Sequence, residues 1–427
     1  MSNTKRKDNK GRILEQNEIQ RANGRYMYRY TDFNGIRQSY YSYKLFSTDK
    51  TPKGKKDTMS IREFKREINI ASKDGIMYKQ GEMSLNELFD THLEYKYKMK
   101  KVTANTYRNY KNAWKYTRNH KVSQLKIRDL RKHHFELIYK DLLDNGVGKA
   151  TVHLIHKLHK SAMNYAFGAD YIRRNYALDA LDDFDVHLDE KEALTIEQQN
   201  EFLKFVANSN EFEYLHNVLV FMLETGIRVS EMTAFTEFDA DMEDDIISIN
   251  KQYIRQLISK DSSKSEMRMK PPKTFKSNRE LPLSTKAKEA LILQMEYLES
   301  LGLTDNFVID SYKKGEVCER FIFLNKQHNL WQATNFDVQL YKVIDTYNEQ
   351  EKMTAEQECR EPNYLPKFSA HILRHTACTR MSERGMCERV LQDIMGHNKP
   401  QTTKKYNHVD RKRLTDEMNR VDELHFF

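Results

Sequence analysis

An acidic, irregular stretch divides the 427-residue chain, "DALDDFDVHLDEKEALT" at residues 179–195. Immediately at its end, Thr195 and Gln198 have the spacing of a capping box, the pattern with which many helices begin. A polar stretch of this kind between two patterned segments is typical of a linker between domains. The chain is long enough for two to four domains, and it is therefore predicted to be multidomain.

The net charge changes sign across this linker. Residues 1–80 carry a net charge of +10 and residues 83–184 one of +8, whereas residues 185–427 carry −8. A concentration of Lys and Arg in the first 184 residues favours a polyanionic partner, most simply nucleic acid. The alternative is a basic surface that is only solvated.

Two Asn-Gly pairs, at residues 23–24 and 34–35, lie among aromatic and β-prone residues. Asn-Gly accepts the positive φ angles that tight hairpin turns require. A helical pattern follows at residues 60–70. Residues 1–80 are therefore predicted to form a small β-rich module with one helix.

The side chains of these strands alternate between two faces. Arg25 and Arg29 share one face, and Tyr41 and Tyr43 line up on the next strand. One face must pack on the helix, which leaves the other for a DNA groove, as in other β-sheet readers. The four residues are predicted to bind DNA, and the alternative is that the tyrosines pack on the helix.

Residues 83–184 have the pattern of a helical bundle. Ser84 and Glu87 form a capping box, and Tyr107 and Trp114 belong to an aromatic stripe that is interpreted as core. Further along, "TVHLIHKLHK" at residues 151–160 places three histidines at i, i+3 and i+6. No carboxylate or cysteine is in step with them, so a polar helix face is predicted there rather than a metal site.

Residues 185–427 combine both patterns. Helices are indicated at 196–207 and 214–225, a strand-rich region at 245–285, and more helices after it, especially beyond residue 370. In "FMLETGIRVSEM", Gly226 is a typical helix end and Arg228 follows it. A guanidinium fork fixed there suits phosphate oxygens, although a simple pair with Glu231 is the alternative.

Three further stretches of this segment gather cationic and titratable groups. "KPPKTFKSNRELPL" places Lys273 and Lys276 in a turn between two strand-like pieces, from which a lysine can reach a cleft; a solvated hairpin tip is the alternative. "HILRHT" puts His371 and Arg374 on one helical face at i, i+3, with His375 facing elsewhere. "MGHNKPQTTKKYNHV" contains the remaining candidates, His397 and Tyr406.

In this order and at these intervals, the stretches resemble the catalytic boxes of the tyrosine recombinase family, the phage-type integrases. The tyrosine-rich hairpin resembles the arm-binding domain of conjugative-transposon integrases. The catalytic residues that the resemblance implies are Arg228, Lys273, His371, Arg374, His397 and Tyr406. Lys276 stays open as an alternative to Lys273.

Phosphoryl transfer explains the choice of these groups. Attack on a phosphodiester builds negative charge on the non-bridging oxygens, to which the two arginines and His397 can donate hydrogen bonds. Tyr406 is the expected nucleophile, and its ordinary pKa of about 10 calls for cationic neighbours or a base. His371 is placed to accept its proton, and Lys273 to protonate the departing 5′-hydroxyl. The product implied by the family is a 3′-phosphotyrosyl link.

The resemblance implies a multidomain α+β fold: a three-stranded sheet plus helix that binds arm-type sites (1–80), a helical core-binding domain (83–184), and a mixed, mainly helical catalytic domain with a small antiparallel β-sheet and a C-terminal tail helix (185–427). The implied function is site-specific integration and excision of a mobile element. The alternatives are a type IB topoisomerase-like strand transferase and a catalytically silent DNA-binding regulator.

The implied partners are double-stranded DNA at core-type and arm-type sites and three copies of the same chain, in a tetramer that passes through a Holliday junction. An excisionase and a DNA-bending protein are expected accessories. No metal or other cofactor is expected. The apolar runs are too short to span a bilayer, no secretory signal is evident, and the four cysteines show no paired spacing, so a cytoplasmic location is expected.

Overall fold

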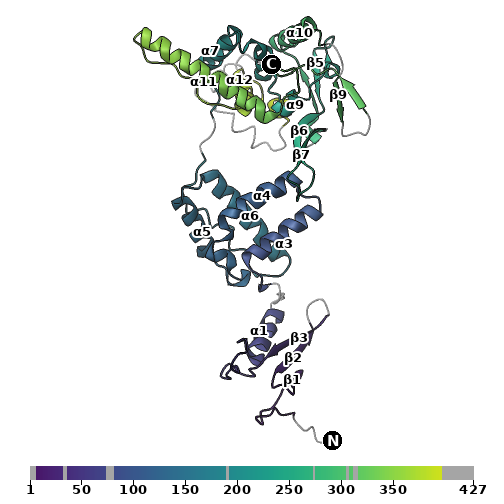
Figure 1. Cartoon of the computed structure of the whole chain (residues 1–427), viewed down its shortest axis with the longest axis vertical. Helices are drawn as coiled ribbons and strands as arrows, with labels where there is room; N and C mark the ends of the chain where they lie inside the picture. Colours follow the sequence, from purple (N-terminus) through teal and green to yellow (C-terminus); the bar gives the residue numbers. More distant parts are fainter. Residues whose placement is uncertain are drawn as a thin grey trace, which may run out of the picture. The chain divides into compact units, whose positions relative to one another are not determined.

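The computed structural model describes residues 6–31, 36–73, 81–188, 192–272, 275–303, 307–310 and 316–396. The chain divides into two compact units, Met1–Asp189 and Glu190–Phe427. The division falls inside the acidic stretch that the sequence indicates as a linker (Figure 1). The finer boundary near residues 80–83 stays a prediction.

The first unit begins with a sheet module, the described part of residues 6–73. Its strands are β1 (Glu18–Gln20), β2 (Tyr26–Thr31) and β3 (Arg37–Ser42), antiparallel in the order β1-β2-β3, and its helix is α1 (Ile61–Lys73). The helix lies against β2 and β3 (Figure 1). Tyr26, Tyr28 and Tyr40 face it, and Phe64 of α1 stacks on Tyr40 at a centroid distance of 3.7 Å. The alternation of side chains along the strands thus places these three tyrosines against the helix.

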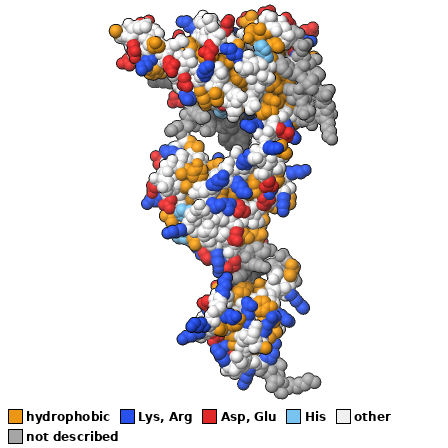
Figure 2. All heavy atoms as spheres, in the orientation of Figure 1, with side chains coloured by type: hydrophobic (Ala, Val, Ile, Leu, Met, Phe, Trp, Pro, Cys, Tyr) orange, Lys and Arg blue, Asp and Glu red, His pale blue; other side chains and the backbone are white. Residues whose placement is uncertain are grey.

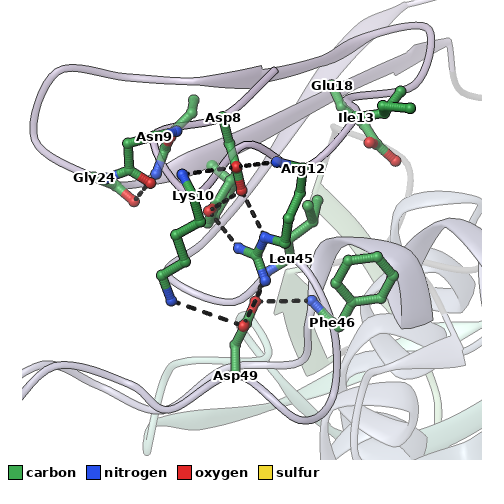
Figure 3. Close-up of polar contacts among 12 residues, drawn as sticks. Asp8, Asn9, Lys10, Arg12, Ile13, Glu18, Gly24, Leu45, Phe46 and Asp49 are labelled. Carbon is green, nitrogen blue, oxygen red and sulfur yellow. Dashed lines mark hydrogen bonds and ion pairs between the residues drawn. The ribbon is translucent and has the colours of Figure 1, made fainter. Parts of the chain in front are cut away.

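An ionic network closes the sheet module at its N-terminal loop (Figure 3). The Arg12 guanidinium donates through Nε to Asp8 Oδ2, through Nη1 to Asp49 Oδ1 and through Nη2 to the Tyr26 hydroxyl, each at 2.7 Å. Burial raises the pKa of Asp8, but hydrogen bonds from Arg12 and Tyr26 outweigh it and hold that pKa at about 2. One partly buried cation therefore joins the N-terminal loop, β2 and the loop after β3.

A helical bundle follows in residues 81–188. It contains α3 (Leu85–Lys98), α4 (Ala104–Arg118), the short helices η1 (Lys121–Gln124) and η2 (Ile127–Asp129), α5 (Lys132–Asp144) and α6 (Lys149–Gly168). The predicted capping box is present, because the backbone N–H of Ser84 donates to Glu87 Oε2 at 2.7 Å and its Oγ accepts from the Glu87 N–H. Trp114 is fully buried and stacks on Phe89 at 3.9 Å. The aromatic stripe is core, as interpreted.

The polar histidine face predicted on α6 is wrong. His156 and His159 are buried, and each places Nδ1 near the hydroxyl of Tyr139, at 3.1 Å and 2.9 Å. Burial lowers the pKa of His156 to about 4 and that of His159 to about 3, so both are neutral at pH 7. Within the described part of the chain, no group of three or more His, Cys, Asp or Glu side chains is arranged to hold a metal ion.

The second unit builds one large core from helices that surround small sheets. Its helices are α7 (Ile196–Ala207), η3 (Glu213–Leu215), α8 (His216–Thr225), α9 (Val229–Met232), η4 (Glu237–Asp239), η5 (Phe275–Ser277), α10 (Thr285–Ser300), α11 (Ala333–Gln357), α12 (Ala370–Glu383) and α13 (Glu388–Met395). Its strands are β4 (Ala240–Asp241), β5 (Ile246–Ile249), β6 (Gln252–Leu257), β7 (Ser265–Lys270), β8 (Arg279–Pro282), β9 (Phe307–Asp310) and β10 (Glu316–Glu319).

Helix α8 is the centre of this unit. It packs against α7, α10 and α12, which explains why its run "VLVFML" is apolar on every side. The strands form the antiparallel sheets β4-β5-β8, β6-β7 and β9-β10. Among the helices of the described residues, none combines the length and the apolar character needed to cross a lipid bilayer.

Candidate active site

The site begins where α8 ends. Gly226 adopts a left-handed conformation with φ of +64°, the usual glycine end of a helix. A Cβ atom there would stand 2.5 Å from Cε of Met395, which lies at the end of α13. The left-handed backbone favours glycine, and a larger residue would also displace the end of the Met395 side chain. The reversal brings Arg228 to the start of α9.

Arg228 rests on a buried carboxylate. Its Nη1 donates to Glu231 Oε1 at 2.6 Å, and its backbone N–H donates to Glu231 Oε2 at 3.1 Å. Burial raises the pKa of Glu231, but the neighbouring guanidinium groups of Arg279 and Arg228 more than offset this and lower it below its ordinary value. The pair that the sequence offered as an alternative is thus present. It leaves the Arg228 side chain 34% exposed and able to meet a ligand.

Arg374 comes from the N-terminal half of α12 and is almost completely buried, with 4% of its surface exposed. Nη1 donates to the carbonyl of Gly226 at 2.6 Å, and Nη2 donates to the carbonyl of Met395. Burial, with the like charge of Arg228, lowers the pKa of Arg374 to about 9, so the group stays protonated at pH 7. His371 lies one turn earlier on the same helix and is exposed.

A third arginine, Arg279 of β8, completes the group. Its Nη2 donates to Glu231 Oε2 at 3.0 Å, and its Nε donates to the carbonyl of Ile394 at 2.6 Å. Glu231 is therefore shared, with Oε1 on Arg228 and Oε2 on Arg279. We call Arg228, Arg279, Arg374 and Glu231 the arginine cluster.

All three guanidinium groups reach the last turn of α13. The carbonyls of Ile394, Met395 and Gly396 accept from Arg279, Arg374 and Arg228 respectively. These carbonyls form the negative end of the helix dipole and would otherwise lack helical partners. Three guanidinium groups thus bind the C-terminal end of α13.

The cluster has an excess of positive charge. Three guanidinium groups face one ionised carboxylate, so these four side chains carry a formal charge of +2 together. Buried cations that are not fully balanced favour an anionic ligand, and planar guanidinium forks fit the oxygens of phosphate. The arrangement is suited to bind a phosphodiester and to stabilise further negative charge on it.

Lys273, His397 and Tyr406, three of the predicted catalytic residues, lie outside the described residues. The structure brings together two others that it describes, Arg228 and Arg374, through Gly226 and the end of α13. The roles assigned to all six residues stay predictions.

The lysine-bearing turn lies between two strands, but these strands do not pair with each other as they would in a hairpin. β7 pairs with β6, whereas β8 pairs with β5, so the chain between β7 and β8 crosses from one sheet to another. Lys276 lies in this crossover with an exposed side chain, and its carbonyl faces Gly396 closely: a Cβ at Gly396 would stand 3.0 Å from it. Strand pairing is a long-range property, which explains why local pattern could not distinguish a hairpin from a crossover.

The predicted DNA-binding residues lie on the sheet face opposite α1. The Arg25 guanidinium lies 4.9 Å from the ring centre of Tyr41 and 5.9 Å from that of Tyr43. Arg29 is exposed on the same face. Sequence reasoning missed Arg21, which also lies 4.9 Å from the Tyr41 ring and donates to its hydroxyl at 3.1 Å. Cationic groups held over aromatic rings on an open face are suited to a nucleic-acid backbone.

Basic side chains are also frequent elsewhere in the first unit. Figure 2 shows Lys and Arg gathering over the sheet module and over the part of the helical bundle near α3 and α4, whereas Asp and Glu are prominent along the edge of the second unit. This surface agrees with the separation of charge along the chain.

The family model described as "Phage integrase family" matches residues 192–413, just over half of the chain. The chain belongs to the phage integrase family. A second model, described as the DNA-binding domain of Tn916 integrase, matches residues 1–72. The tyrosine recombinase resemblance of the sequence is confirmed, and with it the enzyme class.

Relatives span the whole length. The transposase from transposon Tn1545 of Streptococcus agalactiae is 29% identical over 98% of this chain and 97% of its own length. The transposase from transposon Tn916 of Enterococcus faecalis has the same identity and coverage. A solved structure of the Tn1549 transposon integrase in complex with a circular intermediate DNA is 22% identical, covers 79% of this chain and 99% of that one, and has a TM-score of 0.66. The multidomain α+β fold is thereby confirmed.

Proposed function

We propose that this phage integrase family member cuts and rejoins DNA at specific sites to integrate and excise a mobile element, through a 3′-phosphotyrosyl intermediate. The observation that carries the proposal is the arginine cluster, whose charge of +2 is built where α8, α9, α12 and α13 meet. Full-length similarity to transposases from two transposons supports the biological role.

The charge of the cluster matches the reaction. A phosphodiester carries one negative charge, and the pentacoordinate state formed on attack by an alkoxide-like oxygen carries two. Arg228 and Arg374 donate to the non-bridging oxygens and so favour the state with more charge. Each preorganised donor of this kind contributes a factor of about 10²–10³ in rate.

The donors are available without dismantling the site. A guanidinium has five N–H groups, and Arg374 donates two hydrogen bonds to carbonyls in the described structure. Arg228 is the more exposed of the pair and approaches the phosphate from the solvent side. Its contact with Gly396 is long, at 3.4 Å, and is the one that a phosphate oxygen replaces most easily.

Covalent chemistry is assigned to residues that are not members of this cluster. The Tyr406 oxygen forms a bond to phosphorus while the bond from phosphorus to the 5′-oxygen breaks. The tyrosyl proton passes to His371, and Lys273, or Lys276 in its place, gives a proton to the departing 5′-oxygen; His397 adds a hydrogen bond to the phosphate. One phosphoester replaces another, so rejoining to a new strand needs no external energy source.

Trapping the covalent intermediate tests this proposal. In a nicked duplex that carries an end of the element, cleavage releases a short fragment that bears the free 5′-hydroxyl; its loss prevents rejoining and accumulates the protein–DNA adduct. Tyr406→Phe is expected to abolish the adduct, and peptide mapping of the wild-type adduct should identify Tyr406. Tyr364→Phe is the matched control, because Tyr364 is an exposed tyrosine of the same unit.

The same experiment separates the alternatives. A catalytically silent regulator forms no adduct with wild-type protein. A topoisomerase-like enzyme forms the adduct on DNA without the element ends equally well. The match of residues 1–72 to an integrase DNA-binding domain favours the recombinase, since two DNA-binding modules suit two kinds of site.

The finer organisation belongs to the same proposal. The domain division is 1–80 for arm-type sites, 83–184 for core-type sites and 185–427 for catalysis. Four copies act on two DNA sites through a Holliday junction, with an excisionase and a DNA-bending protein as accessories, in the cytoplasm. The separate cores of the sheet module and of the helical bundle support the first boundary.

A further inference from the structure

Arg279 is a buried arginine with no place in the reaction described so far. Its side chain is 6% exposed. Nε donates to the Ile394 carbonyl at 2.6 Å, Nη1 to the Ser277 carbonyl at 3.0 Å and Nη2 to Glu231 Oε2 at 3.0 Å. Each of its three nitrogen atoms therefore donates to a protein acceptor, which ties the side chain to three parts of the unit.

These acceptors belong to three separate parts of the site. Glu231 is the carboxylate on which Arg228 rests, Ile394 begins the row of carbonyls that ends α13, and Ser277 belongs to the crossover that carries the candidate lysines. One rigid fork thus fixes the distances among a catalytic arginine, the chain that leads to His397 and the lysine segment.

We propose that Arg279 is a positioning residue for strand cleavage, which holds Glu231 so that Arg228 stays directed toward the scissile phosphate. This inference rests on the proposed recombinase function. It assigns Arg279 a role that acts through its hydrogen bond to Glu231.

The sharing of Glu231 explains how the residue acts. Oε1 accepts from Arg228 at 2.6 Å while Oε2 accepts from Arg279 at 3.0 Å. Oε2 also accepts from the backbone N–H of Arg228 at 3.1 Å. If Arg279 no longer donated to Oε2, this oxygen could accept from the Arg228 guanidinium too, and a two-pronged pair between a guanidinium and a carboxylate is the stronger arrangement. Arg228 would then be drawn into the pair and away from the phosphate.

A role in folding alone does not require this residue type. Buried ion pairs contribute little net stability compared with well-packed apolar groups of the same volume. Only arginine offers three nitrogen donors in a fixed plane, whereas a lysine reaches its acceptors from a single nitrogen. Arg279→Lys therefore keeps the charge near Glu231 but loses the simultaneous hold on three elements.

Single-turnover cleavage of the nicked duplex tests the proposal with the full-length protein. At saturating DNA, Arg279→Lys is expected to reduce the cleavage rate by about 10²-fold, with DNA affinity within about threefold of wild type. Arg320→Lys is the matched control, since Arg320 is an exposed arginine that pairs with Glu237 at 2.8 Å in the same unit. Its rate should equal that of wild type.

A second substrate distinguishes positioning from loss of structure. A methylphosphonate at the scissile position carries no charge, so cleavage there depends less on the arginine donors. The defect of Arg279→Lys should shrink at least about tenfold on this substrate, as should that of Arg228→Lys. A smaller population of folded protein would reduce both rates by the same factor, and an equal defect on the two substrates would overturn the proposal.

Two further outcomes are decisive. If Arg279→Lys does not fold, Arg279→Gln also removes the guanidinium from Glu231 Oε2 and is subject to the same comparison of the two substrates, with the same expected and contrary results. If wild-type protein forms no adduct, or Tyr406→Phe still forms it, the recombinase proposal itself fails. Normal wild-type cleavage with an unimpaired Arg279→Lys enzyme rejects only the role of Arg279.

Discussion

On the sheet module, Arg25 and Arg21 lie over the ring of Tyr41 on a face that points away from α1. In the second unit, Arg279 and Arg374 are buried and donate to a carboxylate and to backbone carbonyls. The first arrangement keeps cations near water, where they can meet many phosphates with little specificity of position. The second fixes each cation through several hydrogen bonds to the protein, and chemistry at a single phosphate demands such fixed positions.

The difference indicates which region contributes DNA affinity and which contributes to catalysis. Exposed cations gain binding energy by releasing counterions from DNA, and that gain falls with salt. Buried cations have already lost their hydration on folding, so they stabilise developing charge without reorganisation. We therefore expect substitutions in the two regions to change different measurements.

The largest effect is expected at Arg374. Arg374→Lys keeps the charge but cannot span the Gly226 and Met395 carbonyls and the phosphate at once, so cleavage of the nicked duplex should slow by about 10²–10³-fold. DNA affinity, measured by fluorescence anisotropy, should change little. Arg384→Lys is the control at the exposed end of the same helix. A cleavage rate near that of wild type would mean that Arg374 is only structural.

A smaller effect, of the opposite kind, is expected on the sheet module. Removal of Arg25 and Arg29 together, as Arg25→Ala with Arg29→Ala, should weaken duplex binding about tenfold. The slope of log affinity against log salt should become shallower by about 1 for each phosphate that the variant no longer neutralises, while the cleavage rate of saturated complexes stays the same. Arg66→Ala removes an exposed charge from α1 on the opposite side and should leave the slope unchanged. Equal slopes for all three proteins would contradict the assignment of this face.

The smallest effect is expected from Asp8, which affects the stability of the sheet module. Its pKa is about 2 in the folded chain, below its ordinary value near 4, so it stabilises the fold above about pH 4 and loses that contribution as the pH falls toward 2. Asp8→Asn should therefore increase amide exchange in β2 at pH 7, and the difference from wild type should vanish near pH 2. A difference that stays constant across this range would show that Asp8 acts through shape and not through charge.

Short-range sequence patterns account for much of what was predicted about the helices and strands. Capping boxes at Ser84 and Thr195, the glycine end at Gly226 and the alternation of Tyr26 and Arg25 each depend on a few neighbouring residues, and the structure has each of them. The order of the arginine and histidine boxes was enough to indicate the family. No local signal identified Arg279 as part of the site. Its place two residues before the buried Leu281 of β8 indicates only that both side chains lie on the same face of the strand.

The sequence by itself determined which segments form helices and strands, where the charge lies and which residue types are at hand for phosphoryl transfer, because these properties repeat over short distances. Tertiary structure alone decided that β8 leaves β7 to pair with β5, that His156 and His159 are buried, and that residues 228, 279 and 374 meet at one helix end. The physical reason is that burial and charge sharing depend on neighbours that lie far away along the chain, 48 residues for Arg279 and Glu231 and 148 for Arg374 and Gly226, and no local sequence period records such distances.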